Sequence, residues 1–473
     1  GISGGYQLAA RPGEEPQVAL AVKQGLVRGF AFEQGALAFH QSLRLAERAL
    51  VQGPLAALSR LTAPAARRDP PVVGEQDNIK VCANSACTST VPVAATVRYA
   101  GSRGVIYLDN EMPAGADAFT QADLDQLGTL FDDYIHPIDT AAFGAVSDLD
   151  GDERIAILIT DQVNDLSPNC TEGRIVGYFF GGDLLFARQG SNQREVFFAF
   201  APKPATSTCN AVTRTSALRA LPPVLIHELQ HMISFNEHVL QRGQSDESVW
   251  LNEALSHFAE ELGQRLIPDP NCPASASCFS QFASGNLQNA YLYLEDPEAT
   301  FLVAPSTDGP TLAGRGAGWL FVRWIADHFA ADTLLGTQVT RALLKRGTPG
   351  AANIAGVTGQ PFDRLVGEWL LANWLENLSG FPVTGRLNYR TWNLRSTYAA
   401  NYPAVFDRPY PLEPDVTDGS FAKIGTLRGG SGGYLRVVVP AGQNQMVVRL
   451  ADQSGVTRIG AQLRPRIAVA RIR

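Results

Sequence analysis

HELQHMISF (His227–Phe235) and SVWLNEALSHFAEEL (Ser248–Leu262) are two apolar segments with embedded acids, separated by a short polar stretch. The chain has seven histidines among 473 residues, yet two of them stand four apart in the first segment, with Glu228 between them. On an α-helix, residues four apart lie on one face, about 6 Å apart along the axis, so two imidazoles can bind one ion. The spacing therefore predicts that His227 and His231 are metal ligands on a helix.

Zinc is the metal that this pattern favours. Zinc accepts neutral imidazole nitrogen and carboxylate oxygen in a tetrahedral array, and a catalytic zinc keeps one position for water. Glu228 projects beside the same face, where it can take a proton from that water. The apolar neighbours of the histidines bury the helix, which makes unpaired imidazoles costly. We predict one catalytic Zn²⁺ with Glu228 as the general base. The alternative is a histidine pair that binds no metal.

The third ligand is expected from the second segment. A carboxylate within an apolar stripe is costly to bury unless a cation compensates, so Glu253 is favoured over the other acids. Glu260 and Glu261 are expected on the solvated face of this helix. His257, one turn after Glu253, either orients Glu253 or His227 or is a plain surface histidine. Two histidines and a glutamate are the ligand set of a peptidase-type zinc.

These two segments resemble the gluzincin zinc metallopeptidases, and among them most closely the hyicolysin family of bacterial secreted neutral metalloproteases. The similarity extends over residues 90 to 380, where it includes DLDGDERIAILITD and GAGWLFVRWIADHF. It implies zinc on His227, His231 and Glu253, with Glu228 as base. It also implies a β-rich half, a helical half and a cleft, with an edge strand that pairs with the substrate backbone. Residues 174–182 or 195–200 could supply that edge.

The order of sequence patterns predicts an α+β fold. Short β-branched and aromatic runs, such as GVIYL and IAILIT, precede residue 200 and are typical of strands. Helical periodicity follows, and Pro222 and Pro223 predict the start of the active-site helix. Glycine-rich β patterns return near Asp415. We expect a gluzincin-like catalytic domain over 71–400, with a mixed β-sheet half and a helical half. Flanking β-rich segments are expected at 1–70, as a propeptide or accessory segment, and at 401–473, as a sandwich-like segment.

Composition limits the classes of partner. The net charge of −7 and the lack of a long basic block argue against nucleic acid binding. No apolar run approaches about 18 residues, so no transmembrane helix is expected. The first sixteen residues do not form a signal peptide, and the missing initiator methionine is compatible with removal of a leader. We expect a monomer that acts on protein or peptide substrates.

Six cysteines predict an oxidising compartment. Two close pairs lie in loops of small residues, where a short ring can close, and soft-metal binding is the alternative. An even count favours three disulfides and an exported protein, secreted or periplasmic. The predicted bonds are Cys82–Cys87, Cys272–Cys278 and Cys170–Cys209.

Two weaker signals remain. An oxyanion normally needs a donor beyond the zinc, and Tyr291, Tyr293, Tyr178 and His238 are candidates that are equally compatible with structural roles. The sequence DLDGDER places Asp148, Asp150 and Asp152 at alternate positions, as in the start of a calcium loop, but lacks the later positions of a full EF-hand. Ca²⁺ binding and a plain acidic turn both fit.

The function that these residues support is a secreted zinc endopeptidase. A metallo-aminopeptidase is an alternative. It needs an acidic site for the substrate's free amine, usually a G-x-M-E-N-like strand upstream of the zinc helix. The only upstream methionine is Met112 in LDNEMPAG, where the residues of that motif stand in a different order. A non-catalytic binding or adhesion protein on a peptidase scaffold is a second alternative. An intact Glu228 argues against it, because a protein without catalysis has no chemical need for the base.

Overall fold

The computed structural model describes residues 2–12, 34–53, 68–112, 115, 117–167, 173–203, 211–275, 277–305, 309–382, 384–439, 441–442 and 445–472. The chain divides into two compact units. The site unit consists of Phe30–Asn286 and Leu334–Asn353, and the terminal unit consists of Gly1–Gly29, Leu287–Thr333 and Ile354–Arg473. All the residues of the predicted zinc centre belong to the site unit.

The site unit is built on a six-stranded mixed sheet in the order β2-β3-β4-β5-β7-β6. The central strands β4, β5 and β7 run parallel, whereas β2, β3 and β6 are antiparallel to their neighbours. Strands β5 and β7, IAILI and VFFA, are buried at every residue, as expected for central strands covered on both faces. The strands are β2 (Gln76–Cys82), β3 (Thr90–Ala100), β4 (Gly104–Asp109), β5 (Ile155–Ile159), β6 (Gly177–Phe179) and β7 (Val196–Ala199).

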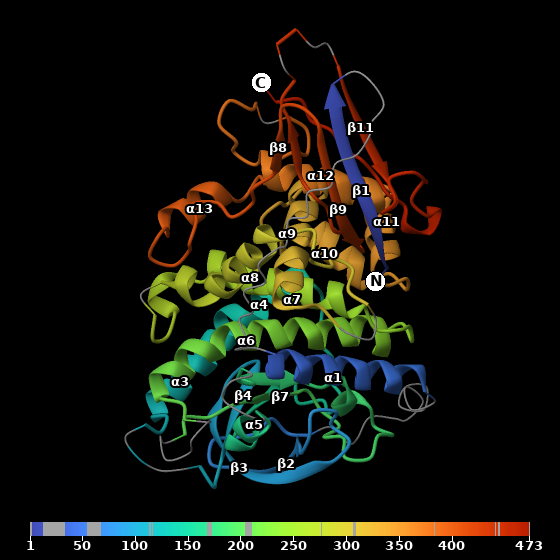
Figure 1. Cartoon of the computed structure of the whole chain (residues 1–473). Helices are drawn as coiled ribbons and strands as arrows, with labels where there is room; N and C mark the ends of the chain where they lie inside the picture. The colour runs from blue at the N-terminus through green and yellow to red at the C-terminus, as the bar shows by residue number, and fades with distance from the viewer. Residues whose placement is uncertain are drawn as a thin grey trace. The chain divides into compact units, whose positions relative to one another are not determined.

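Helices cover this sheet, and α1 and α6 lie on the same side of it (Figure 1). The helices of the site unit are α1 (Gln34–Gln52), α3 (Gln121–Leu130), α4 (His136–Ala142), α5 (Asp161–Asp165), α6 (Arg214–Phe235), α7 (Val249–Leu266) and α10 (Thr337–Leu344). Helices α8 (Ser284–Glu295) and α11 (Ala351–Thr358) cross the boundary between the units. Short π and 3₁₀ segments are η2 (Phe131–Ile135), η3 (Gly181–Leu184), η4 (Asn236–Leu240), η5 (Asp269–Asn271) and η6 (Phe279–Ala283). The fold of this unit is thus mixed α+β.

The active-site helix begins earlier than the prolines predicted. Helix α6 starts at Arg214, and the side chain of Thr213 accepts a hydrogen bond from the Ser216 backbone as its cap. Pro222 and Pro223 therefore lie inside the helix. A threonine cap satisfies an orphan N–H of the first turn, so the cap sets the start of the helix in place of the proline pair.

The terminal unit combines strands from both ends of the chain. Strand β1 lies between β9 and β11 in a three-stranded antiparallel sheet, and β8 and β10 form a separate parallel pair. The domain boundaries expected at residues 70 and 400 stay predictions. The elements are β1 (Ser3–Pro12), α9 (Leu312–Phe329), α12 (Phe362–Leu375), α13 (Leu394–Ala400), β8 (Asp415–Thr417), β9 (Phe421–Arg428), β10 (Leu435–Val437), β11 (Met446–Ala451) and η7 (Ala461–Leu463).

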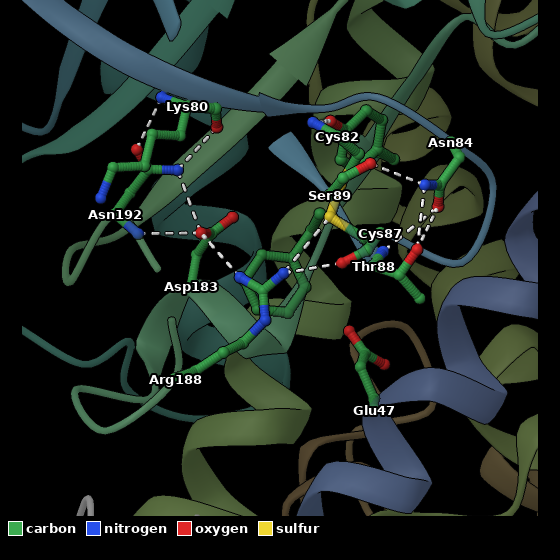
Figure 2. The surroundings of a disulfide bond; sticks show 12 residues. Glu47, Lys80, Cys82, Asn84, Cys87, Thr88, Ser89, Asp183, Arg188 and Asn192 are labelled. Atoms are coloured by element: carbon green, nitrogen blue, oxygen red, sulfur yellow. Dashed lines mark hydrogen bonds and ion pairs between the residues drawn. A yellow bond between two sulfur atoms is a disulfide. The ribbon is translucent and has the colours of Figure 1, made fainter. Parts of the chain in front are cut away.

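Two of the predicted disulfides are present, Cys82–Cys87 and Cys272–Cys278. The first closes the loop between β2 and β3, where Arg188 donates a hydrogen bond to the Cys87 carbonyl at 2.8 Å (Figure 2). Cys170 and Cys209 lie outside the described residues, so their pairing stays a prediction. Every described helix is too short or too polar to cross a bilayer.

Candidate metal centre

Helices α6 and α7 bring together the three predicted zinc ligands. His227 and His231 lie one turn apart on α6, and Glu253 lies in the first turns of α7; all three side chains are buried. Nε2 of His227 is 3.5 Å from Oε2 of Glu253, and Nε2 of His231 is 3.6 Å from Oε1 of Glu253. Ligand atoms around a tetrahedral zinc are about 3.4 Å apart, given bonds of about 2.0–2.2 Å. The two separations between Glu253 and the histidines are therefore close to those expected around a zinc ion.

Glu260 fixes the orientation of His227. Its Oε1 lies 2.6 Å from Nδ1 of His227 and 3.1 Å from Nδ1 of His257. A carboxylate that binds the outer nitrogen of a histidine directs the other nitrogen toward a metal. His257 thus contacts Glu260, which in turn contacts His227, one of the two residues that the sequence suggested His257 could orient.

The expectation that Glu260 and Glu261 form a solvated face is wrong. The Glu260 side chain is 12% exposed and pairs with two histidines, while Glu261 is buried and 2.7 Å from the Arg265 guanidinium. Burial would raise the pKa of Glu260, but the charges and hydrogen bonds of His257 and His227 outweigh it and lower the pKa to about 2.

Two other groups of side chains around His227 could hold a metal ion. The ligand atoms of His227, His257 and Glu260 lie within 4.8 Å of one another, and so do those of His227, Glu228 and His231. The two contacts of Glu260, at 2.6 and 3.1 Å, are hydrogen-bond distances, shorter than the separation of two ligands on one zinc. The contacts of Glu253 are longer and match that separation. The distances of Glu253 are thus those of two ligands that share a metal ion, and the distances of Glu260 are those of a hydrogen-bond partner.

The electrostatics of the centre favour a cation beside His227. Burial lowers the pKa of His227, but hydrogen bonds to Glu253 and Glu260 and the charges of Glu260 and Glu228 outweigh it and raise the pKa to about 10. The carboxylates therefore stabilise positive charge at this point, which a divalent ion supplies. Burial, with the charge of Arg44, holds the pKa of His231 well below its usual value, so this imidazole is neutral, as a zinc ligand must be.

Glu228 is held by the sheet. Its Oε2 accepts a hydrogen bond of 2.9 Å from the Phe179 backbone in β6. Its other oxygen lies 3.9 Å from Nδ1 of His40 on α1. Burial raises the pKa of Glu228, and the charges of His227 and Arg44 and the Phe179 hydrogen bond partly offset this shift. The carboxylate is thus oriented beside the histidines, and its raised pKa makes it a stronger base than an exposed glutamate.

Sequence reasoning missed Asp139. This residue of α4 is fully buried, and neither carboxylate oxygen has a hydrogen-bond partner among the described residues. Burial holds its pKa well above the usual value, although the charge of His227 counteracts this. An aspartate 88 residues before His227 gives no local signal in the sequence; only the packing of α4 shows that it is buried.

The tyrosine candidates have other surroundings. The Tyr178 hydroxyl accepts a hydrogen bond of 3.0 Å from the Cys82 backbone, and its ring stacks on Phe198. Tyr291 belongs to the terminal unit, where its ring stacks on Phe406. The role of either tyrosine in oxyanion stabilisation stays a prediction.

Glu195 lies beside the acidic turn formed by Asp148, Asp150 and Asp152. Asp148 and Asp150 have carboxylate oxygens within 4.8 Å of one another and of Glu195, just before β7. The Asp152 side chain accepts a hydrogen bond from the Arg154 backbone at 2.7 Å. Glu195, 43 residues beyond Asp152, could not be assigned to this turn from sequence spacing.

Comparison with known proteins gives a distant relative. No protein-family model matches the chain. Over 172 residues the chain is 29% identical to the neutral metalloprotease ShpI of Staphylococcus hyicus. The match covers 36% of this chain and 36% of the relative's length. This similarity supports a relationship to a metalloprotease.

Proposed function

We propose that the protein is a secreted zinc endopeptidase of the gluzincin type. The observation that carries this proposal is the approach of Glu253 to Nε2 of both His227 and His231, at 3.5 and 3.6 Å, in a buried setting. Three protein ligands leave one position of a tetrahedral zinc open for catalysis. The similarity to a neutral metalloprotease supports the metalloprotease part of this proposal.

The chemistry follows from the placement of Glu228. His227, His231 and Glu253 would hold a zinc ion, which would supply the Lewis acidity needed to polarise the scissile carbonyl and acidify water. Glu228 accepts the proton of the attacking water and delivers a proton to the leaving amine. Its hydrogen bond with the Phe179 backbone keeps the carboxylate oriented for both transfers. Glu260 holds His227 in the tautomer that presents Nε2 to the metal.

The substrate is proposed to bind as an added strand on β6. Of the two segments that the sequence suggested, residues 195–200 include β7, which is paired on both sides, whereas β6 is the edge of the sheet. An extended peptide on such an edge gains main-chain hydrogen bonds with little dependence on its side chains. This mode suits a protease that acts within protein chains. Export is part of the proposal, because two disulfides are formed.

Replacing the base tests the function. We expect Glu228→Gln to retain one zinc per chain, measured by elemental analysis, and to lose casein hydrolysis by at least about a hundredfold. Glu111→Gln, at an exposed position, is the matched control and should behave as the unmodified protein. Undiminished hydrolysis by the Glu228 variant would remove this residue from the mechanism. Equal cleavage of amino-blocked and free peptides would separate an endopeptidase from an aminopeptidase.

A further inference from the structure

We propose that helix α1 is a built-in inhibitor that occupies the substrate edge of β6. This inference rests on the proposed function, because it takes β6 as the strand to which substrate adds. Two charged side chains of α1, Arg44 and Glu47, bind the main-chain groups that a substrate strand needs. The helix must therefore move before an extended peptide can pair with this edge.

The pairing of β6 with β7 identifies the open groups. The Phe200 backbone donates to the Val176 carbonyl, so Val176 and every second residue after it direct their main-chain groups toward β7. Gly177 and Phe179, which alternate with these residues within β6, direct theirs away from β7 toward the open edge, and Gly181 follows two residues later at the start of η3. The Phe179 carbonyl is therefore a group that an added strand would need, whereas the Phe179 N–H is bound to Glu228.

Three hydrogen bonds join Phe179 and Gly181 to Glu228 or to α1. The Phe179 N–H donates to the base Glu228 at 2.9 Å, and the Phe179 carbonyl accepts from Arg44 Nη2 at 2.5 Å. The Gly181 N–H donates to Glu47 Oε1 at 2.6 Å. Arg44 Nη1 and Glu47 Oε2 are also 3.2 Å apart and form an ion pair. The cation of this pair binds the Phe179 carbonyl, and the anion binds the Gly181 N–H. The pair thus imitates the donor and acceptor of a neighbouring strand.

The helix is packed into this position. Phe39 and Leu43 on the same face are buried, and the Phe39 ring meets that of Tyr178 edge-on at 5.3 Å. Arg44 and Glu47 are themselves each 3% exposed, and two buried charges persist only where their partners are well placed. His40 reaches to 3.9 Å from the Glu228 carboxylate, so α1 also covers the base.

Binding and hydrolysis test the inference separately. One double variant is Arg44→Ala with Glu47→Ala. The other exchanges the two charges, Arg44→Glu with Glu47→Arg, which keeps an ion pair but places an anion near the Phe179 carbonyl and a cation near the Gly181 N–H. Gln52→Ala, exposed at the end of α1, is the control. Fluorescein-labelled oxidised insulin B chain is titrated, by anisotropy, into zinc-loaded proteins that also carry Glu228→Gln. We expect both variants to bind at least about tenfold more tightly than the control, and their Glu228 counterparts to cleave faster.

The outcomes differ for the two proposals. Unchanged affinity in the folded variants overturns the inhibitor, even where cleavage occurs. Tighter binding without any cleavage supports the inhibitor and rejects the zinc peptidase. If the α1 variants fail to fold, amide hydrogen exchange of the Glu228→Gln protein with an unaltered α1 tests the same inference. Saturating insulin B chain should speed amide exchange across residues 37–52, and unaltered exchange with peptide bound would overturn the inference.

Discussion

Single residues in the metal centre have separate tasks, and Glu260 shows this most clearly. It contacts His227 on the nitrogen that faces away from Glu253, so in the proposed centre it would influence the metal without binding it. The sequence predicted which side chains would lie together because the four-residue spacing of a helix fixes which side chains share a face. It misplaced Glu260 because position on a helix does not tell which neighbours cover that face.

Removing the charge of Glu260 should weaken zinc binding without removing a ligand. We expect Glu260→Gln to lower zinc affinity by about 10–100-fold, because His227 loses the carboxylate that orients it and raises its basicity. Competition with a chromophoric chelator measures this affinity. Glu111→Gln is again the control, and Glu253→Gln should lose more. An affinity equal to that of the control would show that Glu260 does not support the centre.

Among the elements, the turn from Asp148 to Asp152 is the one whose role is still open. Asp150 is 3% exposed, and its Oδ1 has no hydrogen-bond partner among the described residues. Burial raises the pKa of Glu195 to about 7, partly offset by hydrogen bonds from Ser147 and the Leu149 backbone. Buried carboxylate oxygens that face one another suit a hard cation such as Ca²⁺. The alternative is an acidic turn that keeps a proton.

Added calcium should distinguish these readings of the turn. We expect CaCl₂ at about 1 mM to raise the Tm by a few degrees, because an ion that binds the folded state alone stabilises it by mass action. Glu195→Gln should abolish this gain while folding normally. Equal concentrations of MgCl₂, which demands a stricter octahedral geometry, provide the control. A Tm that calcium leaves unchanged would favour the protonated turn.

At the scale of the whole molecule, the first seventy residues do not act as one segment. Strand β1 belongs to the sheet of the terminal unit, whereas α1 belongs to the site unit and contacts β6 and the base. Whether residues 1–70 are a propeptide or an accessory segment stays a prediction, and the two described elements of this region belong to different units.

The central position of β1 predicts a large effect of Tyr6. This side chain is 3% exposed within the three-stranded sheet, and its hydroxyl interacts with Glu298. Tyr6→Ala should destabilise the terminal unit by about 3–4 kcal/mol, as for other large aromatic truncations in a core. Urea denaturation measures the loss, and zinc content should stay at one per chain. A variant with unaltered stability would contradict the role of β1 as the central strand.

The sequence by itself determined which residues are candidates for the centre. Helical spacing and the cost of burying charge pointed to His227, Glu228, His231 and Glu253, and those rules act over one or two turns. Tertiary structure alone decided what surrounds them. The edge position of β6, the contacts of α1, the burial of Asp139 and the approach of Glu195 all join residues far apart in the chain. Such contacts depend on how elements pack, and periodicity within one element carries no information about its partners.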